Sequence, residues 1–174
     1  MIVEQTPPKA RPLKLSVTTY KNATWFDACL AEVRTASEVD IATFIFDDPE
    51  FTQTLLQRLK GHAPFSCKVY VDAQAYEKRT SRHQRPRLKE LEAHGAEVLT
   101  CSGYDATALF GATAKKGVLH YKAVVLDRKT AYAGGSNVTK SSRANREFMW
   151  RFSGHPVADV IEGIQELSDH ASSL

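Results

Sequence analysis

The stretch HYKAVVLDRKTAYAGGSN, residues 120–137, decides the fold. Its polar residues His120, Lys122, Asp127 and Asn137 follow the spacing HxKxxxxDxxxxxxGxxN. Five fixed residue types at fixed intervals are far more specific than a lone short motif. The pattern places an imidazole, an ammonium and a carboxamide within reach of one phosphate, and it therefore predicts covalent phosphoryl chemistry.

The residues before and after His120 predict the first strand of a β-hairpin. The run GVLHYKAVVLD, residues 117–127, is rich in strand-forming side chains. Successive side chains of a strand point to opposite faces, so this strand would present His120 and Lys122 on the same face. Two polar groups would then point into one pocket.

The second strand is predicted to return beside the first. DRKT is a turn signal, and TAYAG, residues 130–134, follows it as a short antiparallel strand. This strand leads to Asn137, which can donate to a phosphate oxygen. The glycine pair before it allows the backbone to approach an anion, and we expect a short helix to begin near Ser136.

The spacing resembles the catalytic signature of the phospholipase D superfamily, the HKD motif. The order of predicted elements is also similar to one half of the phospholipase D fold from residue 13 onward. The resemblance is closest to small nucleases and phosphodiesterases that carry one motif per chain. It implies that His120 attacks phosphorus to form a phosphohistidine, while Lys122 and Asn137 hold the non-bridging oxygens and stabilise the transition state.

The resemblance also implies supporting residues. Family members use an acidic residue shortly after the Asn to accept from the second ring nitrogen of the His, and Glu147 lies at about that place. Asp127 belongs to the catalytic signature, and we expect it to stabilise the hairpin and the basic side chains rather than to contact substrate. Gly135 stands where many members have Ser, with Ser136 one position later, and we expect both to line the phosphate site.

Strands that alternate with helices predict an α/β fold: a mixed β-sheet flanked by helices on both faces, as in one phospholipase D-like half-unit. Residues 1–12 are a Pro-rich tail, and residues 13–174 form one catalytic domain without an internal repeat. Besides the hairpin, apolar periodicity predicts strands at 13–19, 39–46, 67–72, 97–101 and 147–152. It also predicts helices at 25–33, from Pro86 to Gly95, and from Pro156, and a further helix that Asp48 and Pro49 start.

The composition is that of a globular protein. The 174 residues are 43% hydrophobic and 25% charged, which supports a sizeable core and excludes a disordered chain. The net charge of +3 is mild, but residues 78–89 contain six Lys or Arg and no acid. We expect a basic loop there that contacts phosphates, although a solvated surface loop is an equally good interpretation. The basic candidates for substrate contact are Arg79, Arg82, Arg85, Lys115 and Lys116.

These residues predict a metal-independent phosphodiesterase that acts through a phosphohistidine. His120 would displace the leaving alcohol, and water would hydrolyse the covalent intermediate. Lys122 and Asn137 would neutralise the phosphate, and no Asp/Glu cluster has magnesium-ligand spacing, so we expect neither metal nor cofactor.

Three hypotheses about the substrate stay open. Nucleic acid is preferred because the basic residues can follow a polyanionic backbone. The first alternative is a phospholipid hydrolase of the cardiolipin-cleaving type, for which Leu109 and Phe110 are the only candidates for an apolar entry rim. The second is a catalytically silent module that binds nucleic acid or phosphate.

Further expectations concern environment and assembly. The cysteines are too far apart for a Cys-x-x-Cys metal site and fall in apolar patterns, so we expect buried reduced thiols in a cytoplasmic or other intracellular protein. No run of about 18 apolar residues could span a membrane, and the sequence leaves open whether an N-terminal anchor or signal was removed. Since one motif supplies one His120, we expect a homodimer whose two-fold axis passes through the active site, where the second copy supplies the general acid.

Overall fold

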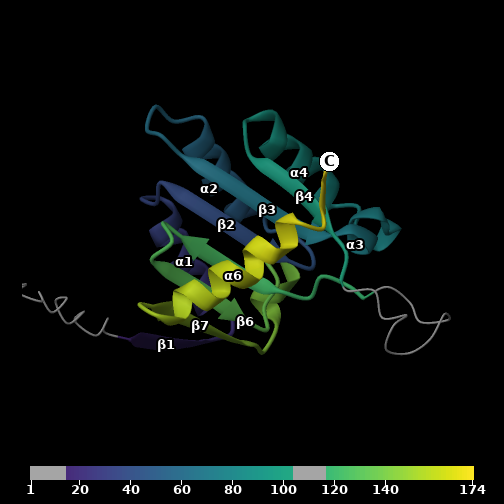
Figure 1. Cartoon of the computed structure of the whole chain (residues 1–174). Coiled ribbons are helices and arrows are strands. Elements are labelled where there is room, and N and C mark those ends of the chain that lie inside the picture. Colours follow the sequence, from purple (N-terminus) through teal and green to yellow (C-terminus); the bar gives the residue numbers. More distant parts are fainter. Residues whose placement is uncertain (1–14, 104–116) are drawn as a thin grey trace, which may run out of the picture.

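The structure, a computed structural model, describes residues 15–103 and 117–174, which form one mixed β-sheet with helices on both faces (Figure 1). The strand order is β1-β7-β6-β5-β2-β3-β4-β8. The strands are β1 (Ser16–Lys21), β2 (Glu38–Thr43), β3 (Ser66–Asp72), β4 (Glu97–Cys101), β5 (Lys122–Leu126), β6 (Thr130–Gly134), β7 (Phe148–Ser153) and β8 (Ala171–Ser173). The helices are α1 (Thr24–Val33), α2 (Pro49–Leu59), α3 (Ala73–Glu77), α4 (Gln84–Ala93) and α6 (Pro156–Ser168), with 3₁₀ turns η1 (Arg79–Ser81) and η2 (Ser141–Ala144).

The sheet joins a parallel part to an antiparallel part. Strands β2, β3 and β4 are parallel, whereas β5, β6, β7 and β1 pair antiparallel in succession. Strand β5 connects the two parts because it also pairs antiparallel with β2. The predicted α/β class with a mixed sheet is therefore confirmed.

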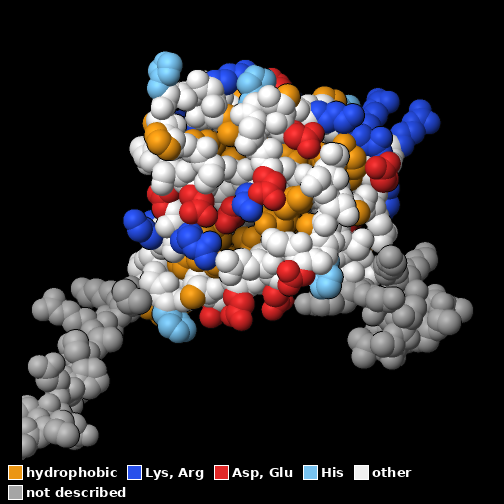
Figure 2. Space-filling model, turned by 45° about the horizontal axis from the view of Figure 1, so that its top comes forward, with side chains coloured by type: hydrophobic (Ala, Val, Ile, Leu, Met, Phe, Trp, Pro, Cys, Tyr) orange, Lys and Arg blue, Asp and Glu red, His pale blue; other side chains and the backbone are white. Residues whose placement is uncertain are grey.

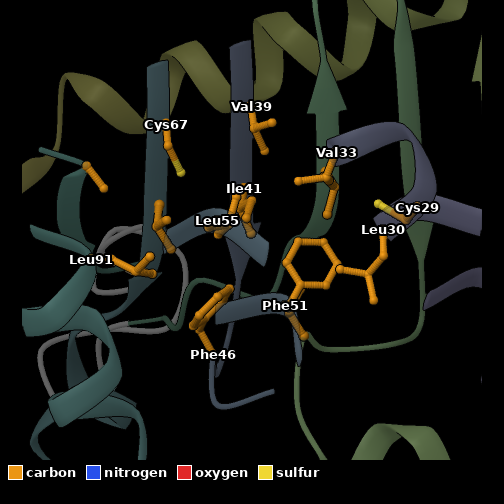
Figure 3. Close-up of a cluster of buried hydrophobic side chains, with 14 of the residues drawn as sticks. Cys29, Leu30, Val33, Val39, Ile41, Phe46, Phe51, Leu55, Cys67 and Leu91 are labelled. Carbon is orange, nitrogen blue, oxygen red and sulfur yellow. The ribbon is translucent and has the colours of Figure 1, made fainter. Parts of the chain in front are cut away.

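The helices bury both faces of the sheet. Helices α1, α2 and α4 cover one face and α6 covers the other (Figure 1). On β5, Val124 and Leu126 pack under the first group, while Ala123 and Val125 pack under α6. A strand buried on both faces reads as a continuous apolar run, as this one does. Figure 3 shows the first of these cores, with labelled side chains Cys29, Leu30, Val33, Val39, Ile41, Phe46, Phe51, Leu55, Cys67 and Leu91.

Local signals place the helices close to their predicted positions. Asp48 caps α2 by accepting a hydrogen bond from the backbone N–H of Phe51 at 2.9 Å, and Pro49 occupies the first turn. Pro156 has the same place in α6. All three cysteines are buried free thiols, as expected. No helix among the described residues is both long and apolar enough to cross a membrane.

The strand predicted through His120 is shorter than expected. Strand β5 begins at Lys122, which pairs with Thr43, the last residue of β2. Strand β6 ends at Gly134, so the residues before Lys122 have no neighbouring strand that would continue the ladder. The prediction of a strand over residues 39–46 is wrong at its C-terminal end. Strand β2 ends at Thr43, and the chain leaves the sheet there.

The basic run 78–89 is not the predicted loop. It contains η1 and the first turns of α4, and Gln84 at the start of α4 is buried. The short helix expected near Ser136 is the 3₁₀ turn η2, which begins at Ser141. The sequence patterns did not predict α3 or β8. The Pro-rich tail, Leu109, Phe110, Lys115 and Lys116 lie outside the described residues.

Candidate active site

Connecting segments meet at the edge of the sheet where β2, β3 and β6 end and β5 begins. Asp72, at the N-terminus of α3, accepts a hydrogen bond from the backbone N–H of Leu119 at 2.8 Å. The carbonyl of Val138 accepts from Asp47 N at 2.9 Å, and the Asp47 carboxylate accepts from Lys140 N at 2.9 Å. Motif residues from both strands of the hairpin therefore lie at one edge.

Lys122 is a nearly buried ammonium at this edge, with an exposed fraction of 9%. Its Nζ donates to the carbonyl oxygen of His120 at 2.9 Å. Burial lowers the pKa of Lys122, and the negative charge of Glu147 partly opposes that shift. A buried ammonium with few partners binds an incoming anion more strongly than an exposed one, because water screens it less.

Thr43 orients Asn137. The fully buried Thr43 hydroxyl accepts from Val138 N at 3.3 Å and lies 3.2 Å from Asn137 Oδ1, to which it can donate, as it can to the carbonyl of Ile45 at 3.0 Å. These contacts occupy the carboxamide oxygen of Asn137. Its amide nitrogen has no partner among the described residues and can donate to a phosphate oxygen.

His120 is exposed, and its ring centroid lies 5.9 Å from that of Phe44. Within residues 15–103 and 117–174, no hydrogen bond engages its ring nitrogens. The imidazole is thus placed beside Lys122 at the open edge of the sheet, where a substrate can reach it.

Glu147 lies within electrostatic reach of Lys122 rather than in hydrogen-bond contact with His120. Its Oε1 accepts from Asn145 Nδ2 at 2.9 Å, and its Oε2 is buried without a partner among the described residues. The role expected for Glu147 in orienting His120 stays a prediction. A buried carboxylate oxygen without a donor is costly, so a partner from substrate or from another chain would stabilise it.

The two glycines at the end of β6, Gly134 within the strand and Gly135 after it, differ in the space around them. A Cβ on Gly134 would collide with the carbonyl oxygen of Phe148 and lie 2.9 Å from Met149 Sδ, so the close approach of β7 requires glycine there. A Cβ on Gly135 would meet nothing nearer than 3.8 Å, so serine fits this position. Ser136 is buried at 1% exposure, and its hydroxyl lies 3.4 Å from the carbonyl oxygen of Asn137.

Asp127 lies at the other end of β5, about 16 Å from Lys122 at about 3.3 Å per residue. Its Oδ1 accepts from Ser37 N at 2.8 Å, Ser37 Oγ at 2.8 Å and Glu38 N at 3.0 Å. Partial burial alone would raise the pKa of Asp127, but the hydrogen bonds from Ser37 and Glu38 outweigh it and leave the pKa below its usual value. Asp127 therefore joins the hairpin turn to the start of β2, away from His120.

The basic residues of 78–89 differ in their contacts. Arg85 donates from Nε to the carbonyl of Tyr76 at 2.6 Å and pairs with Glu77 at 3.1 Å, so its guanidinium is engaged within the chain. Arg79 and Arg82 are exposed. Lys and Arg side chains gather at the upper right of Figure 2, the side on which α3 lies in Figure 1. Asp72, at the N-terminus of α3, contacts Leu119, the residue before His120.

Arg143 is a residue that sequence patterns missed. It donates to both oxygens of the fully buried Asp48, at 2.6 and 3.0 Å, and its guanidinium lies 4.4 Å from the ring centroid of Phe26. These contacts hold η2, which follows the Asn137 segment, against the N-terminus of α2. Asp48 was recognisable as a helix cap, but nothing in the sequence indicates a partner 95 residues away.

Comparisons with known proteins identify the family to which the chain belongs. The family described as "Cardiolipin synthase, PLD-like domain" matches residues 31–167, more than half of the chain. No curated protein sequence matched. Among solved structures, the chain is similar to Nuc from Salmonella typhimurium, a phospholipase D family member, with a TM-score of 0.74 and 17% identity over 92% of this chain and 99% of that one.

Two further structures share the fold. NucT from Helicobacter pylori is similar with a TM-score of 0.76 and 13% identity over 92% of this chain and 100% of that one. The phosphatidylserine synthase of Haemophilus influenzae has a TM-score of 0.66 and 13% identity over 93% of this chain and 40% of its own. These likenesses show the fold, and the family match adds the sequence evidence: the chain belongs to the phospholipase D superfamily.

Proposed function

We propose that the chain is a phosphodiester hydrolase in which His120 is the nucleophile. A ring nitrogen of His120 bonds to phosphorus as the bond to the leaving oxygen breaks, and that oxygen takes a proton from a general acid. Water then attacks the phosphohistidine, the P–N bond breaks, and the imidazole is regenerated. The observation that supports the proposal is that the buried Lys122 ammonium contacts the carbonyl of the exposed His120, while Thr43, the strand partner of Lys122, orients the Asn137 amide.

In this proposal, side chains of the protein neutralise the negative charge of the phosphate. Lys122 and Asn137 supply donors where charge develops, which is the role that a divalent cation has in other phosphoryl-transfer sites. The described part of the chain contains no group of three or more His, Cys, Asp or Glu side chains arranged to hold a metal ion.

The proposed substrate is nucleic acid. Arg79 and Arg82 are exposed and follow α3, whose N-terminal Asp72 contacts Leu119, and they can follow a phosphate backbone. The double variant Arg79→Ala/Arg82→Ala should weaken binding of single-stranded DNA and reduce the log–log salt slope by about one to two units, since each lost phosphate contact removes roughly one. Arg85→Ala is the matched control, because Tyr76 and Glu77 already engage Arg85. Equal binding by the double variant and the wild type would argue against this surface.

A phospholipid substrate is the second candidate. It is supported by the description of the matching family and by the fold shared with a phosphatidylserine synthase. The deciding experiment measures turnover of purified protein on single-stranded DNA, RNA, cardiolipin vesicles and a chromogenic phosphodiester side by side. Turnover of DNA or RNA supports the nuclease, and turnover of cardiolipin alone supports the lipid hydrolase. Binding of nucleic acid without any turnover would instead indicate a silent binding module.

The general acid is proposed to come from a second copy of the chain. The sequence has one copy of the motif, and a phosphorylated His120 cannot also protonate the leaving oxygen. A two-fold axis through the site would place two exposed histidines face to face. If wild type and His120→Asn are unfolded together in equal amounts and refolded, about a quarter of the dimers keep both histidines, so activity should fall to about a quarter. A value near half would show that the acid belongs to the same chain.

A further inference from the structure

A cavity of about 330 Å³ opens beside the proposed active site, between the sheet and α6. His120, Tyr121 and Lys122 line it on the side of the motif, and Asp159 and Gly163 line it on the side of α6. Small apolar side chains of β5 and β6 form its floor. Its volume falls within the range of about 300–1,000 Å³ that small-molecule sites have. A group that fills it therefore lies next to the reacting phosphate.

Gly163 borders this cavity, and the fold does not require a glycine there. It lies inside α6, without the positive φ that favours glycine. A Cβ at this position would lie 3.6 Å from Tyr121 Cε2, which is ordinary van der Waals contact. Glycine in a helix interior is destabilising relative to alanine. The Tyr121 ring lies close to α6 here, and a side chain longer than that of alanine at position 163 would displace the ring or enter the cavity.

The side chains around the cavity select the ligand. The exposed carboxylate of Asp159 repels a phosphate but accepts hydrogen bonds from N–H groups. Tyr121 is 41% exposed and offers an aromatic ring to a flat group. His120 and Lys122 line the opposite wall and face the phosphate, so the portion of substrate that lies between Asp159 and Tyr121 is best matched by a neutral, planar hydrogen-bond donor, which describes a nucleobase. An acyl chain offers no donor to Asp159.

A second aromatic surface adjoins the cavity floor. Trp150 pairs across the strands with Ala133, a residue of the cavity floor. The rings of Phe148 and Trp150 are stacked, with their centroids 6.3 Å apart and an angle of 20° between their planes. Both side chains are exposed, at 51% and 39%. Aromatic side chains next to one another provide stacking surfaces for successive bases of a single strand.

We propose that the cavity binds the base next to the scissile phosphate and prefers guanine. Guanine presents two adjacent N–H donors on one edge, which match the two oxygens of the Asp159 carboxylate. This inference rests on the proposed nuclease function, and it names the base that the site selects.

Binding of nucleoside monophosphates tests the cavity without any turnover. Calorimetry on the wild-type protein should show that guanosine monophosphate binds about tenfold more tightly than ribose 5-phosphate and more tightly than the other three nucleotides. Gly163→Leu fills the cavity and should remove the advantage of every base over ribose 5-phosphate. Gly163→Ala is the matched control and should keep it. Asp159→Asn should lose the preference for guanine while the other bases still bind.

The outcomes distinguish failure of the base-binding proposal from failure of the proposed hydrolase function. Equal affinity of the wild type for guanosine monophosphate and ribose 5-phosphate would overturn the proposal, and so would a guanine preference that survives Asp159→Asn. Asp159→Asn also keeps the test decisive if Gly163→Leu fails to fold. Turnover of a base-free chromogenic phosphodiester by wild type is measured in parallel: its absence counts against the hydrolase, whereas nucleotide binding still decides the cavity. Reduced cardiolipin turnover in Gly163→Leu with unchanged nucleotide affinities would assign the cavity to lipid instead.

Discussion

The two ends of the β5–β6 hairpin contain residues of the same motif, but the polar groups at the two ends differ in how many hydrogen-bond partners they have. At the turn, the Asp127 carboxylate accepts three hydrogen bonds from Ser37 and Glu38. At the open end, the buried Lys122 donates to one carbonyl, and a buried oxygen of Glu147 has no partner among the described residues. Polar groups with satisfied partners stabilise a fold, whereas buried groups with unused capacity indicate a binding site.

This difference divides the motif into a structural part and a chemical part. Substitutions at the open end should reduce turnover with little or no loss of stability. Substitutions at the turn should reduce stability with little loss of turnover.

The largest effect is expected at Lys122. In Lys122→Met, turnover of a phosphodiester should fall by about a hundredfold or more, because the transition state loses a buried ammonium. The free energy of unfolding should rise in acidic buffer. Burial lowers the pKa of Lys122, so the fold destabilises its charged form, and that penalty is fully present below the folded pKa. Urea denaturation checks the sign.

Lys60→Met, at an exposed lysine that follows α2 and is not part of the hairpin, is the matched control for Lys122→Met and should change neither quantity. A Lys122→Met protein that is less stable than wild type in acidic buffer would place this lysine among the structural residues.

Glu147→Gln should shift the pH dependence of turnover. Glu147 raises the pKa of Lys122 against the effect of burial, so removing its charge lowers that pKa further. The ammonium is then lost at lower pH, and the alkaline limb of the activity profile should move in the acidic direction. An alkaline limb that stays in place would show that another group controls it. Rates measured across the alkaline range decide between the two.

Asp127→Asn should reduce stability with turnover within about twofold of wild type. Loss of charge-assisted hydrogen bonds to Ser37 and Glu38 should lower the free energy of unfolding by about 1–2 kcal/mol. Because the folded pKa of Asp127 lies below the unfolded value, this stabilisation is present above the unfolded pKa and is lost as the pH falls through the folded pKa. The difference in free energy of unfolding between variant and wild type, measured by urea denaturation, should therefore shrink as the pH is lowered. A large loss of turnover at unchanged stability would contradict the division.

The smallest effect is expected from metal removal. Excess EDTA should leave turnover within about twofold, since Lys122 and Asn137 meet the phosphate charge. Complete loss of activity that magnesium restores would overturn the proposed mechanism.

Local sequence signals predicted the parts of the fold that depend on neighbours in the chain. The hairpin, the α2 cap at Asp48 and the α/β order follow from patterns within a few residues. The end of a strand depends on its partners, and the sequence did not show that β2 stops at Thr43. His120 therefore lies just before β5, although the sequence predicted it to be within that strand.

The motif residues of the candidate site could be predicted from the sequence, whereas the residues that contact and orient them could not. His120, Lys122 and Asn137 are recognisable because the motif fixes their spacing. Thr43 contacts Asn137 across 94 residues, and Arg143 contacts Asp48 across 95. Such contacts depend on the tertiary fold, for which one sequence carries no local signal.

The most direct test of the account is to trap the covalent intermediate. A substrate with a labelled scissile phosphate is mixed with the protein, quenched in alkali, and the chain is digested and analysed by mass spectrometry. The account predicts an acid-labile phosphoryl adduct on His120 that wild type forms during turnover and His120→Asn does not form. Turnover without any adduct on the chain, or an adduct on a residue other than His120, would contradict the assignment of His120 as the nucleophile.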